Sequence, residues 1–298
     1  MDHVTTPDGL HLEVLTMGPE DGYPFLFHSG TPSAAVVFEP FRPILERLSL
    51  RLITYSRPGY GTSTPRPERS EPWTVADDVV DSVAVLDEVG AGEFVTLGWS
   101  GGGPRALACA ALLPERCRAA VSFAGLAPYD APGLDWFAGM GPENVRDFTA
   151  ATEGREVVEP LLAEQVAMMA NVTAAEIVAS FGQLVDSVDA GALTGELAEY
   201  LAASFRRATA QGVVGLLDDS MVLAAPWGFD LRAIDVPVGV WQGAHDLMVP
   251  FGHGRWLAAT IPGARVHLFD DEGHVSLVHR FDEMLAELRE LAGAPPPD

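Results

Sequence analysis

Cysteine, basic residues and long apolar runs are all scarce in this sequence. Among its 298 residues only Cys109 and Cys117 are cysteines, and their spacing fits neither a disulfide framework nor a zinc site, so we expect a reducing compartment. The opening stretch MDHVTTPDGLHLEV contains no Lys or Arg and no continuous apolar segment. No later run approaches the length of a membrane span. These absences argue against a secretory signal and predict a soluble, cytoplasmic protein.

Positive charge is also in short supply. Eighteen Lys and Arg residues face 42 Asp and Glu residues, which gives a formal net charge of −24. Such a charge repels phosphate backbones and anionic membrane surfaces, so we expect neither a nucleic-acid nor a membrane partner. Because 48% of the residues are hydrophobic, the chain can bury the core of one large domain, with or without an insertion.

Short apolar runs alternate with amphipathic stretches of helical length in two parts of the chain. This alternation is typical of an α/β fold, with a mostly parallel sheet flanked by helices. The carboxyl-terminal stretch GAPPPD is expected to fray, because three prolines cannot continue a helix. The predicted strands are 23–30, 50–59, 93–100, 118–125, 236–243 and 264–270, and the predicted helices are 34–48, 74–90, 102–115, 252–262 and 276–293.

The segment 130–225 breaks this alternation. It is rich in Ala, Glu and Leu, shows helical periodicity and contains no convincing strand. We expect an inserted helical lid here, on a core domain formed by 1–129 and 226–298. Met168 and Met169 are expected in the core of this lid rather than in contact with substrate. The predicted helices of the lid are 155–170, 173–184 and 194–212, the second opening with Thr173 and Glu176 in capping-box spacing.

The sequence GWSGGG at 98–103 contains the pattern Gly-x-Ser-x-Gly around Ser100. A predicted strand precedes it and a predicted helix follows it, which is the context of a nucleophile elbow. The glycines leave room for a sharp turn, and the helix N-terminus favours negative charge beside the serine. The pattern alone is a weak signal, because a serine hydroxyl needs a base and an acid to become a nucleophile.

Two later residues supply those partners. Asp246 and His274 each follow a predicted strand, at the edge where open α/β sheets gather their sites. The chain order Ser100, Asp246, His274 is that of the α/β-hydrolase arrangement. Asp130 is an alternative acid, since it follows the predicted strand 118–125.

The remaining candidates have simpler interpretations. Trp99 either packs beside the elbow or lines a substrate pocket. Turn geometry accounts for His28 and His245, while His253 and His267 lack the spacing of metal ligands. The glycine run is followed by no Lys-Ser or Lys-Thr, which argues against a phosphate loop, and it lacks the spacing of a dinucleotide site. We therefore expect neither a metal nor a cofactor.

The chain resembles the α/β-hydrolase superfamily, in its lid-bearing branch of esterases and proline iminopeptidase-like hydrolases. The stretches that carry the resemblance are FHSGTPSA, SRPGYGTS, GWSGGG, GAHDLMVP and DEGHVS. The resemblance implies that Ser100 is the nucleophile, that His274 is the general base and acid, and that Asp246 orients the histidine.

An oxyanion hole needs two backbone N–H donors. Gly101 follows the nucleophile and is expected to supply the first. The second is expected in the loop after the strand 23–30, where relatives commonly read His-Gly-x-Pro and this chain reads HSGTP at 28–32. Aligning Gly-Thr-Pro makes Thr31 the donor and leaves Gly30 as the alternative.

These residues predict a cofactor-independent serine hydrolase that cleaves a small, largely apolar carboxylic ester through an acyl-enzyme. Cleavage of amides or peptides, as in the proline iminopeptidases, and lactone opening would use the same machinery. The iminopeptidase elbow places tryptophan after the serine, whereas Trp99 precedes Ser100. A ligand sensor on the same fold is the alternative from a different class, and a lyase or cofactor-free oxygenase is supported by analogy of fold alone.

Overall fold

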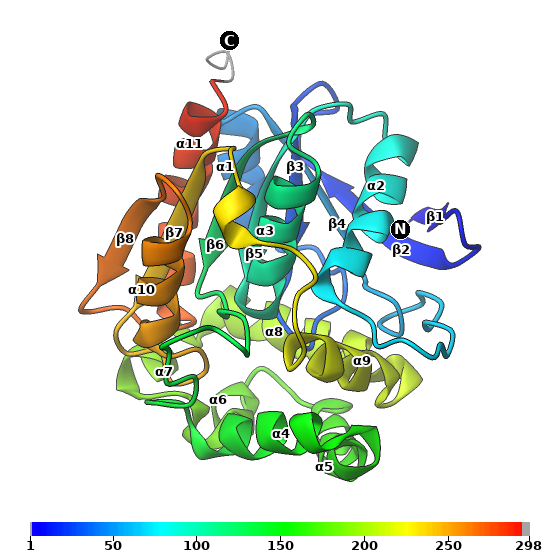
Figure 1. Ribbon diagram of the computed structural model, residues 1–298, viewed down its shortest axis with the longest axis vertical. Coiled ribbons are helices and arrows are strands. Elements are labelled where there is room, and N and C mark those ends of the chain that lie inside the picture. The colour runs from blue at the N-terminus through cyan, green and yellow to red at the C-terminus, as the bar shows by residue number, and fades with distance from the viewer. Residues whose placement is uncertain (1, 294–298) are drawn as a thin grey trace.

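A computed structural model describes residues 2–293, so nearly all of the predicted frayed tail lies outside the described residues. Eight strands form one sheet in the order β1-β2-β4-β3-β5-β6-β7-β8 (Figure 1). The pairs β1/β2 and β2/β4 are antiparallel, and all other neighbours are parallel. The strands are β1 (Asp2–Thr5), β2 (His11–Met17), β3 (Tyr23–His28), β4 (Leu50–Tyr55), β5 (Phe94–Trp99), β6 (Cys117–Phe123), β7 (Val238–Gly243) and β8 (Arg265–Phe269).

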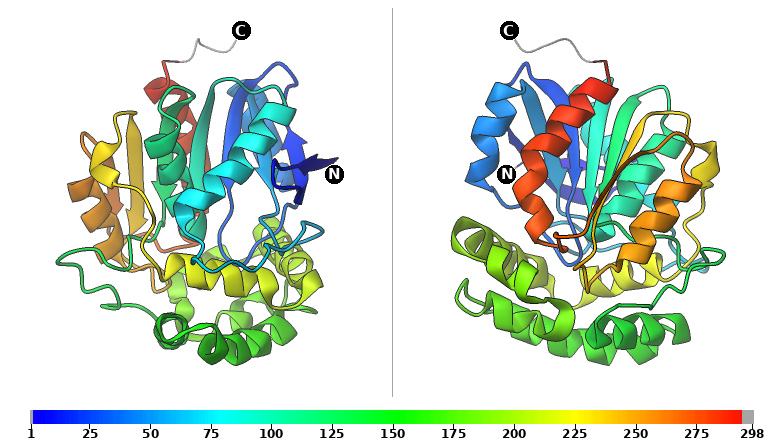
Figure 2. Two further views of the ribbon diagram at one scale, coloured as in Figure 1. Left: turned by 45° about the vertical axis from the view of Figure 1, so that its right-hand side comes forward. Right: turned by 90° about the vertical axis from the view of Figure 1, so that its left-hand side faces the viewer.

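Helices cover both faces of the sheet (Figure 2). Phe25 and Phe27 of β3 pack against Phe281 on one face, while Leu26 joins a second core cluster on the other. Burial on both faces explains why the central strands read as nearly continuous apolar runs. On the first face lie α1 (Arg42–Arg47) and α11 (Phe281–Leu291), and on the second lie α2 (Val79–Glu88), α3 (Gly103–Leu112) and α10 (Phe251–Thr260).

The predicted α/β-hydrolase architecture is confirmed, and so are the six predicted strands, although β4 ends earlier than expected. The hairpin of β1 and β2 was not predicted; burial of both faces of β2 obscures its alternation. The predicted helix 34–48 is wrong over its first half. Only α1, preceded by a 3₁₀ turn at Glu39–Phe41, is helical there, because Pro40 and Pro43 favour helix starts and exclude helix interiors.

The described residues between β6 and β7 contain helices and no strand. These helices lie across the edge of the sheet where the parallel strands end (Figure 2). The predicted helix 173–184 is wrong in extent. Helix α6 is short, and Gly182, with a φ of +57°, departs from helical conformation. Thr173 and Glu176 nevertheless form their predicted side-chain contact. The helices are α4 (Pro142–Glu153), α5 (Arg155–Met169), α6 (Ile177–Ser180), α7 (Ser187–Ala192), α8 (Gly195–Ala208) and α9 (Val214–Leu223), of which α4, α7 and α9 were not predicted.

Polar contacts join α8 to strand β2 and to the loop after β3. Arg207 pairs with Glu13 of β2, whose carboxylate is fully buried. Ser204 Oγ lies 2.9 Å from Ser33 Oγ in the loop after β3. Within residues 2–293, no helix is long and apolar enough to cross a membrane.

Candidate active site

Ser100 occupies a sharp turn between β5 and α3. The turn Ser100–Gly102 is a single 3₁₀ turn, and Ser100 adopts a φ of +55°, a conformation that L-residues other than glycine rarely take. A Cβ at Gly98 would fall on the backbone of Gly102, and one at Gly102 would fall on the carbonyl of His28. The glycines therefore have the steric role that the sequence predicted, and the strain is concentrated at the serine.

Asp246 and His274 form a buried pair at the ends of β7 and β8. His274 Nδ1 lies 2.8 Å from Asp246 Oδ2, and the two residues are 3% and 2% exposed. Asp246 Oδ1 accepts hydrogen bonds from the backbone N–H groups of Met248 and Val249, at 2.9 and 2.7 Å. Because an ionised carboxylate only accepts, His274 must donate from Nδ1, which leaves Nε2 with a lone pair in the neutral ring.

The electrostatic environment favours protonation of His274. Burial alone would lower the pKa of His274, but the charge of Asp246, its hydrogen bond and the charge of Asp189 raise the pKa above the ordinary 6.5. A histidine with this pKa can take a proton and hold it as an imidazolium.

Ser100 and His274 line one small cavity of about 50 Å³, and Trp99 contributes to its wall. No hydrogen bond joins Ser100 Oγ to His274 in the described chain; such contacts often tighten only when substrate binds. Trp99 also stacks on Phe123, with ring centroids 5.5 Å apart, so it packs and lines the cavity at once. The alternative acid, Asp130, is exposed, and no described contact connects it with His274.

The loop after β3 lies against the elbow. An ideal Cβ at Gly30 would stand 3.4 Å from Ser100 Cβ, and one at Gly101 would run into the side chain of Thr31. Both predicted oxyanion donors, Thr31 and Gly101, thus flank Ser100, and Gly30 remains the alternative to Thr31. The Thr31 N–H has no hydrogen-bond acceptor among residues 2–293.

A larger cavity of about 350 Å³ opens from Ser100 toward α4, α5 and α9. Leu126, Phe148 and Leu162 give it an apolar wall, and Glu143 and Asp147 add carboxylates.

The two adjacent methionines of α5 differ in exposure. Met169 is partly buried against the core, but Met168 is 64% exposed; both line the larger cavity. The predicted burial of Met168 in the core of the lid is therefore wrong, because most of its surface is exposed and the rest contributes to the cavity wall.

Asp189 of α7 holds the backbone of the loop that carries His274, and sequence reasoning missed it. Its carboxylate accepts hydrogen bonds from the N–H groups of His274, Val275 and Ser276 at 2.8–2.9 Å. Asp189 is fully buried, whereas the local sequence VDSVDAGAL reads as an acidic surface turn. Nothing in that stretch indicates a contact with residues 85 positions away.

Burial or a polar partner accounts for each of the other histidines named from the sequence. Burial, followed by the charges of Arg105 and Arg57, lowers the pKa of His28 to about 3. His253 accepts from the Ala127 N–H and donates to the Trp136 carbonyl. His245 pairs with Asp186 and His267 with Glu287. Among the described residues, no group of three or more His, Cys, Asp or Glu side chains could hold a metal ion.

The mostly parallel sheet with helices on both faces and the strand–turn–helix at Ser100 are typical of the α/β class of hydrolases. The family model described as alpha/beta hydrolase fold matches residues 23–280, and the chain belongs to this family.

Individual relatives are distant. The chain is 26% identical to a pimeloyl-[acyl-carrier protein] methyl ester esterase from Chromobacterium violaceum, over 84% of this chain and 87% of the relative. It is 33% identical to a non-heme chloroperoxidase from Streptomyces lividans, but this match spans only 43% of the chain and 46% of the relative. The crystal structure of a hydrolase from Pseudomonas aeruginosa PA01 superposes with a TM-score of 0.69 at 22% identity, covering 98% of both chains. The protein is thus a hydrolase, and an esterase is among the proteins it resembles.

Proposed function

We propose that this protein cleaves carboxylic esters with Ser100 as nucleophile, His274 as general base and acid, and Asp246 as the residue that orients His274. The observation that carries the proposal is the 2.8 Å contact between His274 and Asp246 in the wall of a cavity that Ser100 also lines. The similarity to a methyl ester esterase supports the same reaction class.

In the first half of this reaction, Ser100 Oγ attacks the carbonyl carbon of the ester while His274 Nε2 takes its proton. The carbonyl oxygen becomes an oxyanion, which the N–H groups of Gly101 and Thr31 stabilise, with Gly30 as the alternative to Thr31. The C–O bond of the ester then breaks, and the imidazolium of His274 protonates the leaving alcohol. In the second half, water attacks the acyl-Ser100 ester while His274 Nε2 takes a proton from it. The bond between Ser100 Oγ and the acyl carbon then breaks, the imidazolium returns its proton to Ser100 Oγ, and the acid leaves.

We assign the substrate's apolar part to the larger cavity. At about 350 Å³ it is at the lower end of the range of small-molecule sites, which favours a small acyl or alcohol group. Residues 130–225, expected from the sequence to be a lid, contribute Phe148 and Leu162 to its wall. We propose that this segment covers the site and shields the apolar part of the substrate from bulk water.

Activated esters of increasing acyl length test this function and measure the pocket. We expect multiple turnovers with short and medium acyl chains and a sharp fall in kcat/KM once the chain exceeds the cavity. A lactone and an aminoacyl-proline amide belong in the same panel. Preferential cleavage of the amide would favour the iminopeptidase alternative, and preferential opening of the lactone would favour a lactonase.

A fluorophosphonate probe combined with multiple-turnover kinetics separates the enzyme from a ligand sensor. Both would be labelled at Ser100, but only the enzyme sustains turnover of the ester. Labelling with a single slow turnover would contradict the proposal.

Removing the Asp189 charge should shift the pH dependence of hydrolysis. General-base catalysis needs neutral His274, so kcat/KM rises with pH through the pKa of His274 in the free enzyme. Asp189 raises this pKa, so Asp189→Asn should move the acid limb of the kcat/KM profile to lower pH.

Asp271→Asn provides the matched control, because Asp271 lies exposed in the loop after β8 that also carries His274. We expect its acid limb to stay in place, since solvent screens an exposed charge. An acid limb that is unchanged in Asp189→Asn, or shifted upward, would show that this carboxylate does not act on His274.

A further inference from the structure

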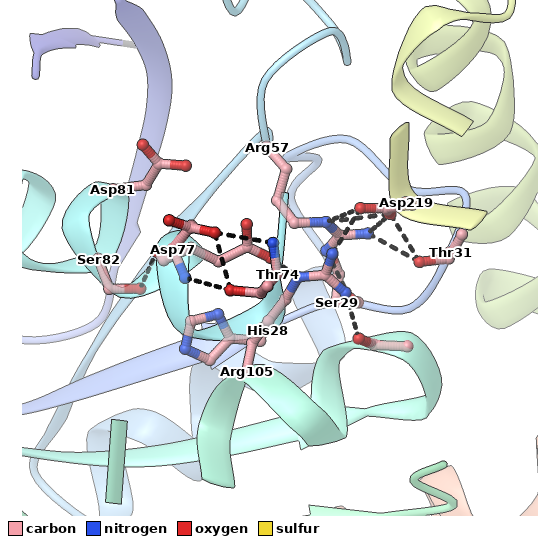
Figure 3. A network of polar contacts seen from close by, with 12 residues as sticks. His28, Ser29, Thr31, Arg57, Thr74, Asp77, Asp81, Ser82, Arg105 and Asp219 are labelled. Carbon is pink, nitrogen blue, oxygen red and sulfur yellow. Dashed lines mark hydrogen bonds and ion pairs between the residues drawn. The ribbon is translucent and has the colours of Figure 1, made fainter. Parts of the chain in front are cut away.

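A buried network of opposite charges lies behind the elbow and the loop after β3 (Figure 3). Its centre is Asp219 of α9, which is 5% exposed. Arg57, in the loop after β4, places Nη2 at 2.5 Å from Asp219 Oδ2, and Arg105 of α3 places Nη2 at 2.6 Å from Asp219 Oδ1. Thr31 Oγ1 and Tyr60 OH donate to the same carboxylate at 2.7 and 3.0 Å.

Each arginine also binds a carbonyl beside Ser100. Arg57 donates to the carbonyls of Ser29 and Gly30, both at 2.8 Å, and Arg105 donates to the carbonyl of Gly101 at 2.5 Å. A peptide unit is planar, so fixing a carbonyl also fixes the N–H of the following residue. Arg57 therefore orients the N–H groups of Gly30 and Thr31, the two alternatives for one oxyanion donor.

Arg105 acts on the other donor in a similar way. The Gly101 carbonyl belongs to the peptide unit that adjoins the one carrying the Gly101 N–H, within a turn where added Cβ atoms would meet backbone or the side chain of Thr31. Asp219 thus connects, through two guanidinium groups, the two chain segments that must present N–H groups to one oxygen atom.

We infer that Asp219 is a positioning residue, which holds Arg57 and Arg105 in the orientation that aligns both halves of the oxyanion hole. This inference rests on the proposed function. Arg57, Arg105 and Thr31 belong to the core on either side of Ser100, whereas Asp219 belongs to α9, in the segment between β6 and β7. The segment proposed to cover the pocket therefore also contributes Asp219, which supports the proposed oxyanion hole.

The charge state of Asp219 suits this role. Burial alone would raise the pKa of Asp219, but Arg105 and Arg57 hold the pKa well below the ordinary value of a carboxyl. Asp219 therefore stays ionised throughout the pH range of an esterase assay. Arg105 has a second buried partner, Asp78, at 2.6 Å, whereas Arg57 pairs with no other carboxylate among the described residues. Loss of the Asp219 charge should therefore disturb Arg57 and the loop after β3 most.

The test is Asp219→Asn, assayed by steady-state hydrolysis of a small activated ester. Because the oxyanion forms only in the transition state, misaligned donors lower kcat and leave substrate binding intact. We expect kcat to fall by about tenfold to a hundredfold while KM stays within about twofold. The rate of phosphonylation of Ser100 by a fluorophosphonate should fall in parallel, since this adduct also places an oxygen in the oxyanion hole.

The neighbouring residue offers a matched control. Asp218 of α9 pairs with Arg155 of α5 and has no described contact with the elbow or the loop after β3. Asp218→Asn makes the same chemical change on the same helix, so we expect it to keep kcat and the labelling rate. The inference would be overturned if kcat and the labelling rate were the same in Asp218→Asn and Asp219→Asn.

A milder variant keeps the inference testable if Asp219→Asn does not fold. Thr31→Val removes the hydroxyl that donates to Asp219 and accepts from Arg57, but keeps the side-chain shape, the backbone N–H and the charges of Asp219 and Arg57. We expect kcat to fall by about threefold to tenfold, and Thr31→Ser, which restores a hydroxyl, to recover most of it. Equal activity of the Val and Ser variants would overturn the inference.

A wild-type protein that neither turns over esters nor reacts with the probe would overturn the proposed function and this role together.

Discussion

Ser100→Ala is expected to lower kcat for a small activated ester by about 10⁶-fold, to the level of the oxyanion hole and substrate binding alone. The hydroxyl is the attacking group, and no neighbouring side chain can replace it. Folding should be unaffected, because alanine keeps the Cβ at the φ of +55° and the hydroxyl has no hydrogen-bond partner in the described chain. We expect the free energy of unfolding to change by less than about 0.5 kcal/mol. Initial-rate kinetics and thermal denaturation measure the two effects.

Ser122→Ala is a matched control for this change. Ser122 is buried in the adjacent strand β6, and its hydroxyl also has no hydrogen-bond partner among the described residues. We expect full activity in this variant. Wild-type turnover by Ser100→Ala would mean that the elbow is only a strained connection between strand and helix.

Asp246→Asn is expected to lower kcat by about 10⁴-fold with little change in KM. The Met248 and Val249 N–H groups both donate to Asp246 Oδ1, whereas only Gln242 Nε2 donates to Oδ2 beside His274, at 2.8 Å. The two backbone donors therefore keep the carbonyl oxygen of the asparagine at the Oδ1 position. Its NH₂ group then faces His274 Nδ1, which can only accept from it. The proton of the neutral ring moves to Nε2, where it blocks acceptance of the Ser100 proton.

Asp130→Asn tests the alternative acid. Asp130 is exposed and has no described contact with His274, so we expect wild-type kinetics. Full activity of Asp246→Asn together with a large loss in Asp130→Asn would reverse the assignment. Thermal denaturation of both variants checks that the activity differences arise in folded protein.

The helical segment between β6 and β7 lines the larger cavity and also contacts the loops of the candidate site. Asp189 of α7 binds three N–H groups of the His274 loop, and Asp219 of α9 contacts the loop after β3 through Thr31 and Arg57. If the proposed function is correct, movements of α7 or α9 would change the alignment of the catalytic groups as well as access to them.

Much of the core was predictable from local sequence. The six apolar runs, the glycines around Ser100 and the capping pair Thr173 and Glu176 all act over a few residues, and the structure contains each of them. The helix expected at 34–48 and the length of that at 173–184 were wrong, because Pro40, Pro43 and Gly182 outweigh the apolar periodicity. Helices α4, α7 and α9 escaped prediction; α7 is short, and the positions of all three depend on packing against the core.

The sequence by itself determined the class of fold and the three side chains proposed for the chemistry, because strand periodicity, a glycine elbow and polar residues after strands are local patterns. Only the tertiary structure decided which acid meets His274, since Asp130 and Asp246 both follow strands but only Asp246 contacts the ring. It also decided that Asp189 and Asp219, which read as surface charges, are buried against the candidate site. The physical reason is that their partners lie 85 or more positions away in the sequence, and no local pattern encodes such a distance.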